Sequence, residues 1–156
     1  MVFERDITSI DELPKVANEL LQTFCNERIF LFDAEMGSGK TTFIKELSKQ
    51  LGSNANFSSP TYSIVNEYKI PDGKIFHFDL YRLKNEDELI EIGFTDYLQP
   101  NAYLFIEWPQ LASNLLDGEK YLTIQIQQNG DNRILTTKDT SNQWFTNSLK
   151  LITVVK

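Results

Sequence analysis

The stretch Asp33–Phe43 reads DAEMGSGKTTF and concentrates two glycines, a lysine and two threonines. It follows the apolar run Ile29–Phe32, which is rich in β-forming residues, and it leads into Phe43–Leu51, where apolar residues recur at helical spacing. The stretch is therefore predicted to form the turn between a strand and a helix. This turn decides the fold class.

Within the turn, residues 34–41 (AEMGSGKT) fit a phosphate-binding loop, or P-loop. In such a loop the backbone N–H groups and the helix N-terminus form a concave site for anionic oxygens. Lys40 is then predicted to reach the β- and γ-phosphates, and the Thr41 hydroxyl to ligate a bridging Mg²⁺. The sequence thus predicts a nucleoside triphosphate site.

One position departs from the usual pattern G-x-x-x-x-G-K-[ST], because its first glycine is Ala34 here. Alanine is the smallest side chain that can replace glycine at the end of a strand. The alternative interpretation is a glycine-rich turn that only caps a core helix. The strand-turn-helix context favours the phosphate-binding loop.

The composition predicts one globular domain, residues 1–156, with 41% hydrophobic and 12% aromatic residues. Lys and Arg number 15 against 22 Asp and Glu, a formal net charge of −7, which disfavours direct binding to nucleic acid. The single Cys25 cannot form an internal disulfide. The N-terminus is charged and no apolar run approaches the ~18 residues of a membrane span, so we expect a cytoplasmic protein.

The remaining elements follow from periodicity and turn signals. A first helix is expected after Ser9, with Ile10 and six further residues on its apolar face. Two strands joined by Pro71-Asp72-Gly73 predict an antiparallel hairpin. Further strands are expected at 103–106, 121–127 and 133–137, and a short helix at 86–92. For residues 143–156 the sequence pattern fits either a helix or a strand. We therefore expect an α/β fold: a single P-loop NTPase-like, three-layer domain with a mixed central β-sheet.

A Mg²⁺ ion bound by a P-loop normally takes a further carboxylate from the end of a neighbouring strand. Glu107 follows the apolar run Tyr103–Ile106, so it is predicted to support the metal; the alternative is a solvated carboxylate at the sheet edge. Asp79 lies near the end of the second hairpin strand, expected at 74–80, where it either positions the attacking water or a metal-bound water, or caps the strand end. Strand alternation places the only histidine, His77, on the same face, and a hydrogen-bonded structural role is favoured. Arg82 either meets charge on the γ-phosphate or forms an ion pair, and the ion pair is favoured.

Five blocks between Gly37 and Pro109 occur in a characteristic order: GSGKTTF, SPTY, HFDLYRL, EIGFTDYL and IEWP. In this order they closely resemble the bacterial ATPase family of tRNA threonylcarbamoyladenosine biosynthesis, TsaE (YjeE). P-loops occur in very many proteins, whereas SPTY combined with HFDLYRL and IEW is specific to this family. Past Pro109 the likeness is weak.

The resemblance implies a P-loop domain that binds ATP and Mg²⁺ and hydrolyses ATP slowly on its own. It also implies a partner, the TsaB–TsaD pair, which places a threonylcarbamoyl group on an adenosine next to the anticodon of tRNA; contact with tRNA would be indirect. By the same resemblance Asp79 and Trp108 support hydrolysis, Glu107 helps to hold the metal, and Thr61 lies in a switch-like loop over the γ-phosphate. The implied nucleotide-binding set is Gly37, Ser38, Gly39, Lys40, Thr41 and Thr42.

Two other functions use the same loop. A small-molecule kinase would normally bring a basic acceptor or lid segment, whereas Asn85–Glu91 is acidic. A nucleotide-dependent adaptor would not hydrolyse ATP, and Asp79 and Glu107 would be dispensable for turnover. Trp108 has its own alternative, since a tryptophan beside a strand end is most often a core or interface residue.

Overall fold

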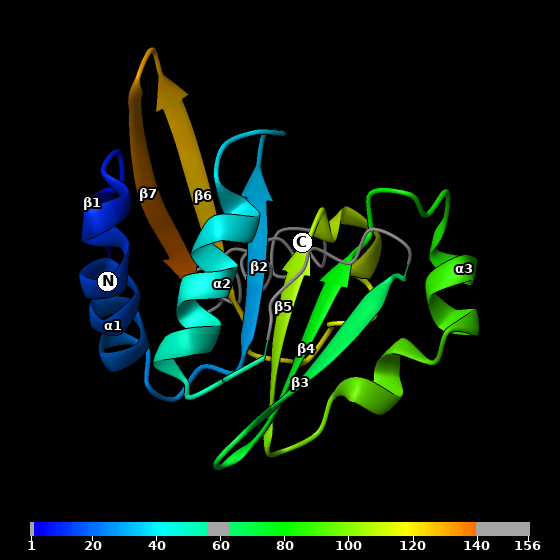
Figure 1. Ribbon diagram of the computed structural model, residues 1–156. Helices are drawn as coiled ribbons and strands as arrows, with labels where there is room; N and C mark the ends of the chain where they lie inside the picture. Colours follow the sequence, from blue (N-terminus) through cyan, green and yellow to red (C-terminus); the bar gives the residue numbers. More distant parts are fainter. Residues whose placement is uncertain (1, 56–62, 140–156) are drawn as a thin grey trace, which may run out of the picture.

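A computed structural model of the chain describes residues 2–55 and 63–139. Seven strands, three α-helices and three 3-10 helices (η) make up this part of the chain (Figure 1). In chain order they are β1 (Glu4–Asp6), η1 (Ile10–Glu12), α1 (Leu13–Thr23), β2 (Ile29–Ala34), α2 (Lys40–Gln50), β3 (Val65–Ile70), β4 (Gly73–Asp79), α3 (Glu86–Glu91), η2 (Phe94–Tyr97), β5 (Ala102–Glu107), η3 (Pro109–Ala112), β6 (Leu122–Asn129) and β7 (Asn132–Asp139).

The described strands form one mixed sheet in the order β1-β7-β6-β2-β5-β4-β3. The central strand β2 is parallel to both β5 and β6, and β4 is parallel to β5. The hairpins β3–β4 and β6–β7 and the edge pair β1–β7 are antiparallel. The carboxyl ends of β2, β4, β5 and β6 therefore meet at one edge of the sheet, where ligands collect in open α/β folds.

Helices cover both faces of this sheet, which confirms the predicted three-layer α/β fold (Figure 1). The helices α1 and α2 pack on one face through Leu20, Phe43 and Leu47, which share a core with Phe30 and Phe32 of β2. On the other face α3, η2 and η3 share a second core with the alternate strand residues. Because both faces are covered, Ile29–Phe32 is buried throughout, as expected for a central parallel strand.

The hairpin β3–β4 turns where the sequence predicts it. Its Gly73 has a φ of 152°, and a Cβ at this position would lie 1.9 Å from the Asn101 carbonyl oxygen. The next residue, Lys74, donates its backbone N–H to the same carbonyl at 3.1 Å. The turn thus depends on a residue without a side chain, because the start of β4 passes close to the chain that enters β5.

The first helix differs from the prediction at its start. Ser9 precedes the 3-10 turn η1 and makes no side-chain capping bond, and α1 begins only at Leu13. The tighter turn rotates Ile10 out of the apolar face, so its side chain is exposed. The other end of the predicted face is correct, since Leu20 and Phe24 are buried. None of the helices in the described ranges is long and apolar enough to cross a membrane.

Candidate phosphate-binding site

The loop between β2 and α2 has the geometry of a phosphate cradle. Gly37 and Gly39 have φ angles of 78° and 101°, a region that residues with a Cβ rarely adopt. Gly39 directly precedes α2, and its carbonyl accepts the N–H of Phe43 at 3.0 Å. Two left-handed residues in three let the loop fold back over the start of α2, so the predicted turn lies at an anion-binding helix N-terminus.

A cavity of about 430 Å³ opens at this loop. Its walls come from the loop, from the start of α2, from the ends of β4 and β5 and from the start of β7. The lining residues are Met36, Gly37, Gly39, Lys40, Thr41, Thr42, Asp79, Tyr81, Glu107, Trp108 and Arg133. Of the nucleotide-binding set expected at 37–42, Ser38 is not among them: it is buried, and its hydroxyl has no hydrogen-bond partner within the described ranges.

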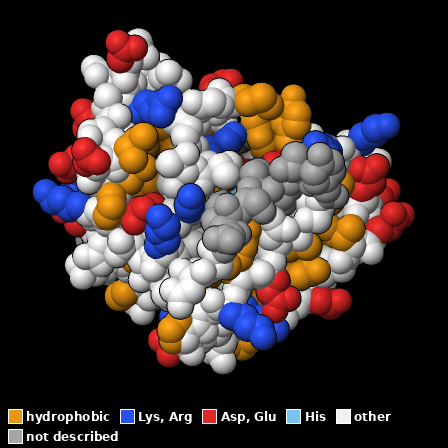
Figure 2. Space-filling model, in the orientation of Figure 1, with side chains coloured by type: hydrophobic (Ala, Val, Ile, Leu, Met, Phe, Trp, Pro, Cys, Tyr) orange, Lys and Arg blue, Asp and Glu red, His pale blue; other side chains and the backbone are white. Residues whose placement is uncertain are grey.

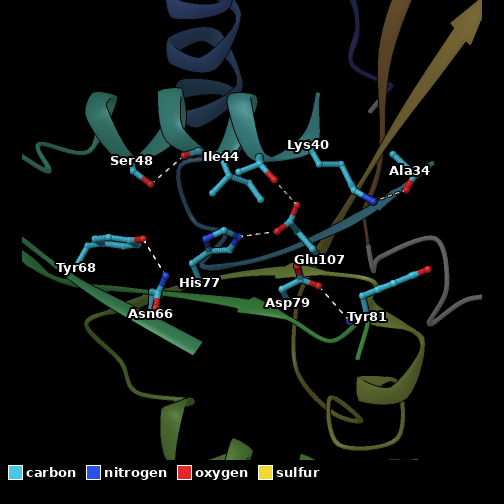
Figure 3. A network of polar contacts seen from close by, with 11 residues as sticks. Ala34, Lys40, Ile44, Ser48, Asn66, Tyr68, His77, Asp79, Tyr81 and Glu107 are labelled. Carbon is cyan, nitrogen blue, oxygen red and sulfur yellow. Dashed lines mark hydrogen bonds and ion pairs between the residues drawn. The ribbon is translucent and has the colours of Figure 1, made fainter. Parts of the chain in front are cut away.

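Glu107 is the hub of a buried hydrogen-bond network (Figure 3). Its Oε1 accepts the Thr41 hydroxyl at 2.9 Å, and its Oε2 lies 2.9 Å from Nε2 of His77. Glu107 ends β5 and is only 2% exposed, so it is not a solvated carboxylate at the sheet edge. The only histidine thus forms the kind of structural hydrogen bond that the sequence favours, and it fixes the orientation of a carboxylate beside the loop.

Lys40 lies between the loop and the end of β5. Its Nζ donates to the Ala34 carbonyl at 2.6 Å and lies 3.7 Å from the centre of the Trp108 ring, a cation–π contact. Burial lowers the pKa of Lys40, and the nearby carboxylates of Glu107 and Asp79 oppose this shift. The ammonium is thus held at the cavity wall by a carbonyl dipole and a ring face, with two anions nearby.

Asp79 reaches the same cavity from β4, because it is the register partner of Glu107 across the parallel β4–β5 pair. Its Oδ1 accepts the backbone N–H of Tyr81 at 3.1 Å. Burial raises the pKa of Asp79, and the negative charge of Glu107 adds to this shift, whereas the Tyr81 hydrogen bond opposes it. The carboxyl group therefore caps the strand end and also borders the cavity, and a raised pKa makes it a better proton acceptor.

Trp108 has an unusual backbone conformation. Its φ of 55° makes it the one non-glycine residue with positive φ in the described part of the chain. The turn directly after β5 directs the ring over Lys40 and places its centre 5.0 Å from that of Tyr81. Left-handed backbone at a bulky residue is costly and concentrates at functional sites. The ring is thus part of the cavity wall.

The structure adds one basic residue to the site and leaves another outside it. Arg133, at the start of β7, lines the cavity although it lies outside the five sequence blocks between Gly37 and Pro109. Arg82 is exposed and does not line the cavity, and it forms no ion pair within residues 2–55 and 63–139, so the expected pairing is not found there. Thr61 and its loop lie outside the described residues.

Comparisons with known proteins agree on one family. The family model "Threonylcarbamoyl adenosine biosynthesis protein TsaE" matches residues 7–135. A TsaE protein of Rickettsia felis is 39% identical over 107 residues, which are 68% of this chain and 62% of that protein. The corresponding protein of Bacillus subtilis is 32% identical over 103 residues, 66% of this chain and 63% of that protein. The match thus spans less than two thirds of the length of these relatives.

A solved structure shares the fold. The crystal structure of Bacillus subtilis YdiB covers 100% of this chain, and 97% of that chain is covered in return, with a TM-score of 0.66. The two sequences are 22% identical, so this likeness supports the α/β architecture alone.

Proposed function

The chain belongs to the TsaE family of threonylcarbamoyladenosine biosynthesis proteins, and from this premise we propose that it is a Mg²⁺-dependent ATPase that supports this modification of tRNA. The observation that carries the proposal is the contact between Thr41 and Glu107 beside the P-loop. It joins the two oxygen donors that a nucleotide-bound metal needs, one from the start of α2 and one from the end of β5.

These two oxygens fit Mg²⁺. Neighbouring ligands of an octahedral ion with bonds of 2.0–2.1 Å lie about 2.9 Å apart. The distance between the Thr41 and Glu107 oxygens is 2.9 Å. Within the described ranges no group of three or more His, Cys, Asp or Glu side chains is arranged to hold a metal. This donor set suits an ion that takes its other ligands from phosphate and water, and when bound it would neutralise charge on the β- and γ-phosphates.

Each remaining residue has a separate task in the proposed reaction. The N–H groups of the loop bind phosphate oxygens, and Lys40 turns from the Ala34 carbonyl towards the same oxygens. His77 holds Glu107 in the orientation that presents its other oxygen to the metal. Asp79 borders the same space and orients the attacking water, and its raised pKa favours acceptance of a proton from that water.

We further propose that a partner completes the site. An arginine supplied by a partner can raise the rate of phosphoryl transfer ~10³ to 10⁵-fold. Arg82, the nearest arginine in sequence to Asp79, is exposed and outside the cavity, and Arg133 enters the cavity from β7, on the other side of β2 from Asp79 and Glu107. The family resemblance points to a TsaB–TsaD-type complex as this partner, with ATP hydrolysis slow in its absence.

Direct tRNA binding is not part of the proposal. The chain has a formal net charge of −7. On the face drawn in Figure 2, basic and acidic side chains are interspersed and do not form a continuous basic surface. A protein that grips an RNA backbone concentrates lysine and arginine on one face. Contact with tRNA is therefore proposed to pass through the partner complex.

The test is a measurement of phosphate and ADP release from ATP and Mg²⁺ by the isolated protein, with and without a TsaB–TsaD pair. We expect slow release that increases when the pair is added. Fast release that the pair leaves unchanged would argue for a self-sufficient enzyme. ADP formation that requires a small-molecule acceptor, without phosphate release, would identify a kinase, and binding without turnover would identify an adaptor.

A further inference from the structure

Arg133 occupies a position at the cavity that the proposed reaction does not yet use. The hairpin of β6 and β7 rises past the carboxyl end of β2, beside the P-loop (Figure 1). In register, Ala34 at the end of β2 pairs with Ile126 of β6, which pairs with Leu135 of β7. Arg133 lies two residues further along this edge, about 7 Å beyond the end of β2. It is therefore level with the loop.

Strand alternation places the Arg133 side chain on the face of the sheet that α1 and α2 cover. Leu135 belongs to the core beneath α1 and α2, and Arg133 lies two residues from it, on the same face. Its Nη2 approaches the Gly37 carbonyl oxygen at 3.5 Å, and its Nη1 lies 3.5 Å from the point where a Cβ on Gly39 would be. The guanidinium thus lies over the glycine turn of the cradle.

The backbone of Arg133 is fixed by hydrogen bonds, and its guanidinium forms no ion pair within the described residues. The N–H donates to the Thr8 hydroxyl at 3.0 Å, and the carbonyl accepts the N–H of Ile7 at 2.9 Å. No carboxylate forms an ion pair with the guanidinium in the part of the chain that the structure describes. The other lysine or arginine that lines the cavity, Lys40, already faces two carboxylates. Among the described cations that line the cavity, Arg133 is therefore the one that remains available to an anionic ligand.

The position of Arg133 in the sheet decides which part of a bound nucleotide the guanidinium contacts. Asp79 and Glu107 lie on β4 and β5, whereas Arg133 lies on β7, on the other side of β2. Within the cavity, Arg133 therefore comes from the β7 side of the P-loop, whereas the Asp79 and Glu107 carboxylates come from its β5 side. A triphosphate whose terminal group lies at the Thr41–Glu107 pair directs its other end towards β7.

We propose that Arg133 binds the α-phosphate of the nucleotide and so fixes the nucleoside end of ATP in the site. This inference rests on the proposed function, since it assigns a further residue to the same ATP site. It gives Arg133 a role in affinity for both ATP and ADP and no role in the hydrolytic step. The interaction is a charge-assisted hydrogen bond, for which the planar fork of arginine suits two phosphate oxygens.

The test compares Arg133→Gln with a matched control, Lys138→Gln, which removes the same charge from an exposed residue of the same strand on the opposite face. Calorimetry with ATP, ADP and inorganic triphosphate gives the dissociation constants, and phosphate release at saturating ATP gives the turnover. We expect Arg133→Gln to weaken ATP and ADP equally, by about 10- to 100-fold, so that KM for ATP rises by a larger factor than kcat falls. Inorganic triphosphate should be weakened as well, and Lys138→Gln should leave all values unchanged.

Three outcomes of these measurements would overturn the assignment of Arg133 to the α-phosphate. Unchanged dissociation constants in a folded Arg133→Gln protein would remove Arg133 from the nucleotide site. A loss confined to turnover, or to ATP and not ADP, would move it to the γ-phosphate, and a loss for nucleotides but not for triphosphate would assign it to the base or ribose. Arg133→Lys should recover part of the affinity, because it restores the charge but not the fork. Failure of the wild-type protein to bind ATP would instead reject the proposed function.

Discussion

Thr41 and Glu107 are 66 residues apart in the sequence, yet the threonine hydroxyl donates to the buried carboxylate at 2.9 Å. The contact joins the start of α2 to the end of β5, two elements that meet because β5 is parallel to β2 and adjacent to it. His77 holds the other oxygen of the same carboxylate from the next strand. Three neighbouring elements thus converge on one carboxylate.

This relationship predicts the effect of Glu107→Gln, which keeps the shape of the side chain and removes its charge. We expect Mg²⁺ to bind about 10- to 100-fold more weakly in the presence of ATP, with a larger loss in hydrolysis than in ATP affinity. A Mg²⁺ titration of ATP turnover measures the Mg²⁺ dependence and the rate of hydrolysis, and calorimetry measures the ATP affinity. Glu91→Gln, an exposed carboxylate on α3, is the control. If the titrations of Glu107→Gln and the wild type overlay, the metal role would pass to Asp79.

Lys40→Met is predicted to weaken ATP binding by about 10- to 100-fold, because a charge-assisted hydrogen bond to phosphate is lost in a partly desolvated site. The fold should tolerate the change, since burial already lowers the pKa of Lys40 and the methionine stem can pack against Trp108. Calorimetry checks the affinity and thermal unfolding checks the fold. Lys45→Met, exposed on the same helix, is the matched control. ATP affinity equal to that of the control would reject the P-loop assignment.

Asp79→Asn tests a pH dependence. Burial raises the pKa of Asp79, so the folded state favours its protonated form, and this preference reduces stability as the pH rises through the raised pKa. The uncharged asparagine can still accept the Tyr81 N–H through its amide oxygen. We expect the nucleotide-free variant to be more stable than the wild type at pH 7, by less than about 1 kcal/mol because the site is partly solvated.

The advantage should disappear as the pH falls below the unfolded-state pKa of about 3.9, where both proteins are uncharged at this position. Thermal unfolding across this pH range measures the difference. Asp117→Asn, which removes the same charge at an exposed position, is the matched control. A variant that is less stable than the wild type at neutral pH would mean that the Asp79 charge stabilises the fold. ATP hydrolysis should fall in the same variant, because the water loses its proton acceptor.

Gly73→Ala is predicted to destabilise the hairpin–strand junction far more than Gly130→Ala. At Gly73 a Cβ would lie 1.9 Å from the Asn101 carbonyl oxygen, whereas at Gly130, with a φ of 62°, nothing lies within 4 Å. The Gly130 variant meets only the backbone strain of the left-handed region, about 1–2 kcal/mol. The Gly73 variant should lose at least about 2 kcal/mol more, because backbone atoms must move. Denaturant unfolding of both proteins measures this difference, and equal losses would contradict the packing argument.

Much of the fold can be predicted from local sequence. Ile29–Phe32, the glycine turn and Phe43–Leu51 each carry their own signal, and the hairpin is marked by Pro71-Asp72-Gly73. The convergence of Asp79 and Glu107 on one cavity also follows from sequence, since the carboxyl ends of neighbouring parallel strands lie at one edge. The start of the first helix was predicted incorrectly because a 3-10 turn and an α-turn share the same local pattern and differ only in how they rotate Ile10.

Other parts of the site depend on the strand order of the sheet and on backbone conformations that local sequence does not specify. Arg133 reaches the cavity only because β6 pairs with β2 and carries β7 beside it, and no local pattern specifies that strand order. The position of Trp108 over Lys40 depends on a left-handed backbone at a bulky residue, which periodicity and propensity both disfavour. The position of Arg133 thus depends on the strand order and that of Trp108 on a strained turn, and local sequence patterns specify neither.

The anchoring of Arg133 to Ile7 and Thr8 links the far edge of the sheet to the cavity. Strand β1 has three exposed residues, and short edge segments of this kind fray at low free energy. Each such opening would break the two hydrogen bonds that Ile7 and Thr8 make with the backbone of Arg133. The Ile7 amide, remote from the P-loop, thereby becomes a reporter: its deuterium uptake should slow as a ligand that requires Arg133 saturates the protein.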